Sequence, residues 1–203
     1  MECGTLQTFK LSNFQTLKLL NFQTLKLLLN MDYHEHLIRP LSRHFVDQLV
    51  QEIYDYPSDF AIIYKLIFDQ EIKVAWRAAW ACQKISEKHP EWFTEVHFNE
   101  IALLTIFTSH GGLKRGCLSI LNNLNIPDPV PVELVNACFE WMISLKSPIS
   151  VQALSMKMLH RICKIEPDFK YELIAYLENV DSYSYSAGFN STRTNVLKSL
   201  INK

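Results

Sequence analysis

Four side chains that could bind an anionic partner follow one another over nine positions of the chain. They are Trp76, Arg77, Trp80 and Lys84. Spacings of three and four residues place side chains on one face of a helix. A cation beside two indole rings can stack on nucleic-acid bases or clasp a peptide through cation–π contacts. The competing interpretation is that Trp76 and Trp80 pack between neighbouring helices and meet no ligand.

Other residues of chemical interest do not combine into a catalytic or metal site. His34 and His36 flank Glu35, but an i, i+2 pair shares one side of a strand and not of a helix, and no third ligand is within evident reach. The His-Gly-Gly run that begins at His110 lacks the pattern of a phosphate-binding loop and predicts a turn. We therefore expect no enzymatic activity, no cofactor and no metal.

Helices must position the side chains between residues 76 and 84, since apolar residues recur at i, i+3, i+4 and i+7 from about residue 37 onward. X-Pro steps, which disfavour helix before the proline, alternate with short polar breaks. The breaks therefore define pairs of helices, called A and B, after one unpaired cap helix over residues 35–54. The predicted A helices are 58–68, 92–107, 130–145 and 168–180, and the B helices are 72–88, 112–125, 149–165 and 188–202.

The helix pairs repeat along the chain with a period of 38 or 39 residues. Each of four apolar rows has successive spacings of 39, 38 and 38. A fixed period near 40 residues is typical of a stacked array of helix pairs. The rows are Val74, Leu113, Val151 and Phe189; Cys82, Leu121, Leu159 and Leu197; Ile85, Leu124, Ile162 and Leu200; and, in the A helices, Ile62, Ile101, Phe139 and Leu177.

Two units also preserve sequence, because residues 84–93 align with residues 161–170: a basic residue, isoleucine, proline, an acid and an aromatic residue recur in register. With the small residues inside 72–88, this pattern resembles HEAT and armadillo-type repeats over about 57–203. The resemblance implies an all-α fold, an α-α superhelix that is a short right-handed solenoid of HEAT-like helix pairs. Gly116, Leu154 and Thr192 replace Arg77 in the later units.

We expect the free faces of the B helices to line the concave side of such a solenoid. On the first B helix, Val74, Ala78 and Cys82 lie on the opposite, core-facing side. The repeat period extends the free face from residues 76–84 into the later units. The predicted binding residues on this concave face are Trp76, Arg77, Trp80, Lys84, Arg115, Asn123, Lys157 and Arg161.

The charges are sorted by layer although the net charge is only −1. Lysine and arginine concentrate in the B segments, whereas 91–108 and 128–145 contain glutamate or aspartate and no lysine or arginine. A basic concave surface would focus the field and favour an anionic ligand. The alternative explanation is the helix dipole, which favours acids at N-termini and bases at C-termini.

The first thirty residues differ from the rest of the chain. Residues 6–30 repeat every eight positions, which leaves no fixed helical stripe. We expect 1–30 to be disordered or a mis-called start upstream of Met31; the alternative is an apolar, lysine-dotted helix that adheres to a partner or a membrane surface. The HEAT-like domain then covers 31–203, as a cap helix and about four helix pairs.

Cysteine usage indicates the compartment. The five cysteines are odd in number, form no CxxC pair and partly fall at apolar repeat positions, which is typical of reduced, buried thiols. Together with the lack of a secretory pattern, this predicts a cytoplasmic protein. No apolar run is long enough to span a membrane.

These patterns predict a non-catalytic scaffold that recognises a protein or peptide, with acidic partners favoured, through its basic, tryptophan-containing concave face. The alternative is a nucleic-acid-binding protein related to HEAT-like DNA alkylation-repair glycosylases. Such glycosylases need an acid in the groove, and Glu87 is the single candidate in the first full unit. A third hypothesis is a structural repeat with no dedicated ligand.

Overall fold

A computed structural model describes residues 33–39 and 42–201. Helices are the regular structure in these ranges, which contain no strand. The chain divides into two units at Arg39 and Pro40. The described part of the first unit is the short helix α2 (Tyr33–Ile38) with Arg39, and the second unit contains the helix pairs.

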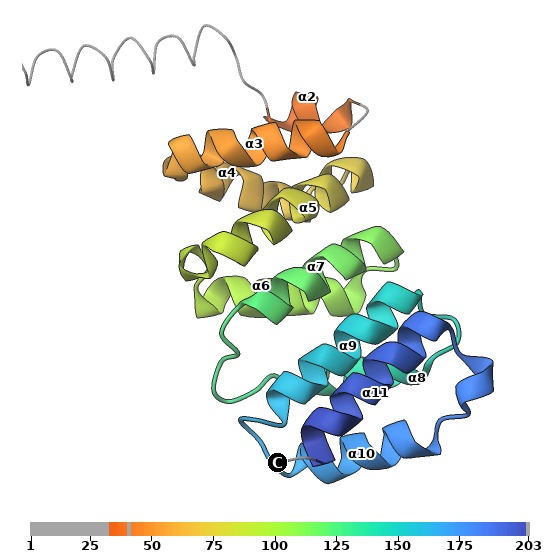
Figure 1. Ribbon diagram of the computed structural model, residues 1–203. Coiled ribbons are helices and arrows are strands. Elements are labelled where there is room, and N and C mark those ends of the chain that lie inside the picture. Colours follow the sequence, from red (N-terminus) through yellow and green to blue (C-terminus); the bar gives the residue numbers. More distant parts are fainter. Residues whose placement is uncertain (1–32, 40–41, 202–203) are drawn as a thin grey trace, which may run out of the picture. The chain divides into compact units, whose positions relative to one another are not determined.

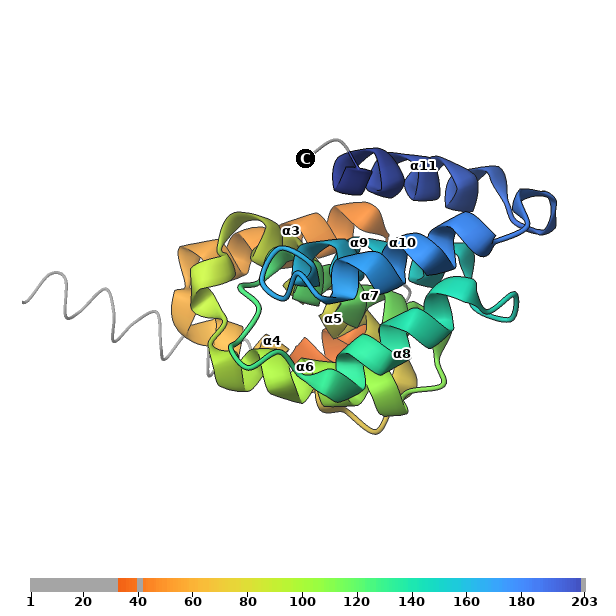
Figure 2. The ribbon, with the colours of Figure 1, turned by 90° about the horizontal axis from the view of Figure 1, so that it is seen from below.

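The second unit is a stack of helix pairs in two layers (Figure 1). Successive B helices pack on one another, and each of α6, α8 and α10 packs on the B helix that follows it. The B layer consists of α3 (Arg43–Asp55), α5 (Ile72–Lys88), α7 (Gly111–Asn123), α9 (Ile149–Ile162) and α11 (Ala187–Ile201). The A layer consists of α4 (Phe60–Lys65), α6 (Glu95–Phe107), α8 (Val132–Ile143) and α10 (Phe169–Asn179). In Figure 2, α6 and α8 lie side by side along one flank of the stack, and they contact each other directly.

The predicted helix over residues 35–54 is two helices in the structure. α2 ends at Ile38 and α3 begins at Arg43. Arg39 precedes a proline in the sequence, which disfavours helix at that residue. Ser42 then starts α3, because its hydroxyl oxygen accepts a hydrogen bond from the Phe45 amide at 3.2 Å.

The predicted apolar rows of the B helices form the core. Val74, Cys82 and Ile85 of α5 are fully buried, as are most of their equivalents in α7, α9 and α11. The row in the A helices begins one residue later than predicted, because Ile62 is 48% exposed and Ile63 is fully buried. The first A helix is interrupted by 3₁₀ turns at Pro57–Asp59 and Leu66–Phe68. A 3₁₀ turn has fewer residues than an α turn and so rotates the register.

Close approach of two B helices explains one glycine. A Cβ atom on Gly116 of α7 would lie 3.1 Å from the Cβ of Ala79 in α5. Both residues are buried. By the repeat period, Gly116 is the equivalent of Arg77 in the first unit. In α7 this position faces α5, and only a very small residue fits there.

The four cysteines of the described residues are free and buried: Cys82, Cys117, Cys138 and Cys163. Burial raises the pKa of the Cys117 and Cys138 thiols to about 12 and that of Cys163 to about 11. These thiols are small apolar core groups at neutral pH. Across residues 33–39 and 42–201, none of the helices is both long enough and apolar enough to cross a bilayer.

Candidate binding surfaces

A row of polar residues on the B helices connects each unit to the one before it. The row has spacings of 39, 38 and 38 residues. Every member bonds to the preceding B helix or to the turn that ends it. We call this row the polar seam, and its members are Lys84, Asn123, Arg161 and Ser199.

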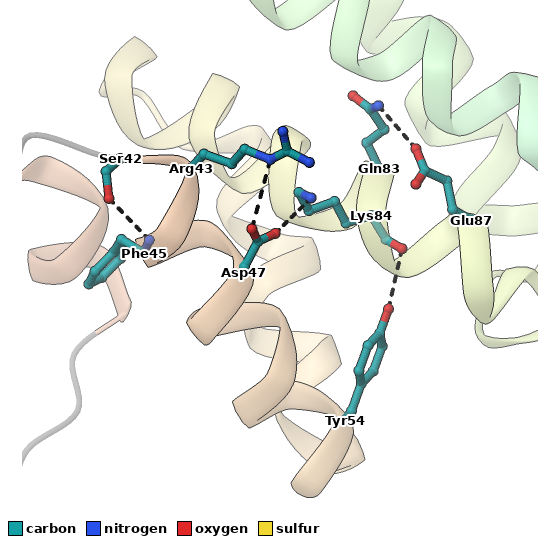
Figure 3. Close-up of polar contacts among 8 residues, drawn as sticks. All are labelled: Ser42, Arg43, Phe45, Asp47, Tyr54, Gln83, Lys84 and Glu87. Carbon is teal, nitrogen blue, oxygen red and sulfur yellow. Dashed lines mark hydrogen bonds and ion pairs between the residues drawn. The ribbon is translucent and has the colours of Figure 1, made fainter.

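Lys84 begins the seam at the interface of α3 and α5. Its Nζ lies 2.7 Å from Oδ1 of Asp47, and its carbonyl accepts a hydrogen bond from the Tyr54 hydroxyl at 3.3 Å (Figure 3). The hydrogen bond from Lys84 lowers the pKa of Asp47. The Lys84 side chain is 24% exposed. Its charge is therefore largely committed to α3 and is not freely available to a ligand.

Asn123 makes the same kind of contact one unit later. Its amide Nδ2 donates to Oγ of Ser86 at 2.9 Å, and the Ser86 hydroxyl donates to the Gln83 carbonyl at 2.7 Å. Ser86 lies 39 residues after Asp47, as Asn123 lies 39 after Lys84. An ion pair in one interface is thus replaced by a neutral hydrogen bond in the next.

Arg161 binds the end of the preceding B helix. Its Nη1 donates to the Leu121 carbonyl at 2.9 Å and its Nη2 donates to the Leu124 carbonyl. These carbonyls lie at the C-terminus of α7, where main-chain acceptors lack helical partners. Burial lowers the pKa of Arg161, although a guanidinium stays charged. In the last interface, Ser199 Oγ lies 3.0 Å from Nε2 of His160.

Five predicted site residues lie outside the seam. The rings of Trp76 and Trp80 stack at 6.4 Å between centroids with an interplanar angle of 15°, and the Arg77 guanidinium carbon lies 5.4 Å from the Trp76 centroid. Both indoles are partly exposed, and Arg115 and Lys157 are exposed.

By the repeat period, Arg115 is the equivalent of Trp76, and Lys157 is the equivalent of Trp80. The four residues therefore occupy two adjacent rows on the same side of the B layer. Lys73 precedes Trp76 on the same side of α5 and is also exposed. We call this surface the B face, and it consists of Lys73, Trp76, Trp80, Arg115 and Lys157.

An apolar groove on the A layer is absent from the sequence-based prediction. It lies between α4 and α6 and has a volume of about 810 Å³. Some of its aromatic and aliphatic side chains face solvent: Phe107 is 82% exposed, Leu103 54% and Phe68 41%. We call it the A groove, and it is lined by Phe60, Ala61, Tyr64, Lys65, Phe68, Trp92, His97, Glu100, Leu103, Leu104 and Phe107.

Four lining residues of the A groove have ionisable side chains: Tyr64, His97, Glu100 and the exposed Lys65. The Tyr64 hydroxyl donates to Oε2 of Glu100 at 2.5 Å, and the rings of Tyr64 and His97 are 4.2 Å apart. His97 Nδ1 accepts the Thr94 amide at 2.9 Å, and burial lowers the pKa of His97. Burial also raises the pKa of Tyr64. At neutral pH the groove therefore presents one carboxylate, the cationic side chain of Lys65, a neutral imidazole and a protonated phenol.

This arrangement offers binding and no evident chemistry. Glu100 already accepts a hydrogen bond from the Tyr64 hydroxyl. Among the residues that the structure describes, no group of three histidines, cysteines or acids could hold a metal ion.

The sequence does contain a signal for the A groove. The segment 95–107 is apolar on both sides of its helix, as in Leu103 and Phe107 opposite Phe98 and Ile101. A helix that is apolar all round is expected to be covered on all sides. α6 is covered by the core on one side only, and its other apolar side faces the groove.

The helix pairs thus define an α-α solenoid with a polar seam, a basic B face and an apolar A groove. The family model for the HEAT repeat domain matches residues 33–200, so the chain belongs to the HEAT repeat family. Comparisons with curated proteins and with solved structures gave no match. The match confirms the HEAT-type helical repeat that the sequence predicted.

Proposed function

We propose that this protein is a non-catalytic scaffold that binds an acidic segment of a protein partner across its B face. HEAT repeats generally serve as protein-interaction scaffolds. The observation that favours this surface is the stacked, partly exposed pair Trp76 and Trp80 in the same two rows as the exposed cations Arg115 and Lys157. Indoles provide apolar contact area at low entropic cost, and the cations provide charge complementarity.

Three of the predicted binding residues belong to the polar seam. Lys84, Asn123 and Arg161 bond within the protein, so we assign them a structural role and assign ligand contact to the B face. Arg77 supports the face by lying near the Trp76 ring.

Nucleic acid is the second candidate ligand, because bases also stack on indoles beside cations. A glycosylase activity is less favoured, since Glu87 is exposed and its carboxylate already accepts a hydrogen bond from Gln83 at 3.2 Å. Free, buried thiols are typical of a reducing compartment, so we also propose a cytoplasmic location.

Peptide display tests the proposal, because a library samples many candidate partner segments at once. An unbiased peptide library is selected on the full chain and counter-selected on the Arg115→Glu, Lys157→Glu variant. We expect the enriched peptides to be acidic and to contain an apolar or aromatic residue. The control variant is Lys164→Glu, Lys198→Glu, which makes the same charge change at exposed positions outside the B face and should bind the selected peptides as the wild type does.

Gel shifts with duplex and single-stranded DNA across a salt series distinguish the second candidate. Binding to phosphates weakens steeply with salt, by a slope of about −0.9 per phosphate neutralised on duplex DNA. A salt-dependent shift that Arg115→Glu, Lys157→Glu abolishes, without enrichment of acidic peptides, would assign the B face to nucleic acid. Peptides that bind the wild type and the B-face variant equally would exclude this face as the binding site.

A further inference from the structure

We propose that the A groove is a second docking site, which binds a basic amphipathic helix from a partner protein. It is separate from the B face, because its lining comes from α4, α6 and the 3₁₀ turns that adjoin them. The inference therefore does not depend on the nature of the B-face ligand.

Exposed apolar area indicates that the groove is an interaction surface. Large apolar side chains gather here, with Phe107, Leu103 and Phe68 all more than two-fifths exposed. Contiguous exposed apolar surface on a soluble protein marks binding sites. A small-molecule site would enclose most of its ligand, whereas Phe107 stands at the rim, four-fifths in solvent.

The dimensions of the groove fit a helix. Its α6 lining extends from His97 to Phe107, which is about 15 Å along a helix axis at 1.5 Å per residue. A bound helix lying along it would place residues i, i+3 or i+4, and i+7 over about 10 Å of this length. At one end, the Phe60 ring lies 5.6 Å from that of Trp92 and 6.0 Å from that of His97. Toward the other end, α6 contributes Leu103 and Phe107.

The charge of the occupant follows from Glu100, which lies between these two apolar ends. The Tyr64 hydroxyl occupies one carboxylate oxygen, Oε2. Within the described part of the chain no ion pair involves Glu100, and the residue is exposed. The neighbouring helices α6 and α8 contain four glutamates and no lysine or arginine. Lys65 also lines the groove, but among the described residues it forms no ion pair with Glu100. An arginine or lysine between two apolar anchors would therefore meet a carboxylate that is not already in an ion pair.

The probe is a fluorescein-labelled model helix with leucine at i and i+7, arginine at i+4, and alanine and glutamine elsewhere. A matched peptide has glutamate in place of the arginine. Fluorescence anisotropy measures the binding of each to the full chain. We expect the arginine peptide to bind at least about tenfold more tightly, the effect of one charge-assisted hydrogen bond.

Surface variants locate the site. Leu103→Ser and Phe107→Ser should each weaken the arginine peptide about tenfold, by loss of apolar burial. Val96→Ser is the matched control, since Val96 lies on α6, is 63% exposed and does not line the groove; it should bind as the wild type does. Glu100→Gln should remove the preference for arginine over glutamate. Circular dichroism checks that each variant keeps its helix content.

Several outcomes would overturn the proposal. One is the absence of binding by either peptide, and another is equal loss of binding in Val96→Ser and Phe107→Ser. A third is homodimerisation through the groove, which sedimentation equilibrium measures. A homodimer that Phe107→Ser dissociates would show that a second copy of the chain fills the groove. The Arg115→Glu, Lys157→Glu variant should bind the arginine peptide normally, so failure at one surface is distinguishable from failure at the other.

Discussion

The guanidinium of Arg161 donates a hydrogen bond to the main-chain carbonyl of Leu121 at 2.9 Å, across the interface between consecutive units. The contact joins the last turn of α9 to the last turn of α7. A residue that the sequence analysis predicted to contact a ligand thus completes the hydrogen bonding of a neighbouring helix end. This relationship separates the structural residues of the B helices from those available to a partner.

Loss of the Arg161 side chain should destabilise the fold. Arg161→Met keeps much of the apolar stem and removes both donors to the α7 terminus, and unsatisfied acceptors of this kind cost about 1–3 kcal/mol of unfolding free energy. Urea denaturation measures the change. Lys157→Met on the same helix is the control, because Lys157 is exposed. An equal effect of the two substitutions would contradict the structural role of Arg161.

Asn123 and Ser86 should be energetically coupled. A double-mutant cycle of Asn123→Ala and Ser86→Ala should give a coupling energy of about 0.5–1.5 kcal/mol, because each single substitution already breaks their shared hydrogen bond. The comparison cycle pairs Ser86→Ala with Asn195→Ala on α11, which should be additive within about 0.5 kcal/mol. Additivity in both cycles would show that the seam contact contributes no net stability.

Gly116 should tolerate little enlargement. Gly116→Val would press new methyl groups against Ala79, whose Cβ lies 3.1 Å from the position of a first added carbon. Overpacking of this kind costs about 1–3 kcal/mol, and thermal or urea unfolding measures it. Gly188→Val is the control in another B helix: Gly188 is exposed, and its nearest neighbour, Ile149, would lie 3.4 Å away. A larger loss at Gly188 would contradict the close approach of α5 and α7.

The buried thiols should be unreactive in the native state. On a Cys3→Ser background, a thiol reagent at pH 8 should label the folded chain slowly and all four remaining cysteines once it is unfolded. Fast labelling of the native chain would contradict the burial of these groups.

The same buried thiols should lower the free energy of unfolding at alkaline pH. Burial holds the thiol pKa values well above the unfolded value of about 8.5. The unfolded chain therefore releases protons first as the pH rises. The thiols therefore leave the free energy of unfolding unchanged below about pH 8.5. Above that pH, the free energy of unfolding decreases by at most about 1.4 kcal/mol per pH unit for each thiol. Urea titrations at a series of pH values measure this slope.

Two docking surfaces, one on the B layer and one on the A layer, would allow the scaffold to bind two partners. The B face offers cations and indoles, whereas the A groove offers apolar side chains around a carboxylate. An acidic segment and a basic helix would therefore bind without competing.

The sequence by itself determined the repeat, the helix pairs and the core. The helix predicted over 72–88 has the same bounds as α5, because its apolar face and its flanking breaks are local properties. The rows through Val74 and Ile85 are buried as predicted, since a fixed period puts equivalent residues at the same angle around each helix. The shift from Ile62 to Ile63 arose where 3₁₀ turns broke that angular rule.

Only the tertiary structure decided which polar residues of the B helices form hydrogen bonds or ion pairs within the protein. It also decided where the apolar groove lies. Periodicity gives the direction in which Lys84 or Arg161 leaves its helix, but not the distance to Asp47 or to the Leu121 carbonyl. That distance depends on how far neighbouring helices are displaced along and around each other. The A groove has the same origin, because the apolar outer side of α6 becomes a groove only where α4 lies beside it and leaves Leu103 and Phe107 uncovered.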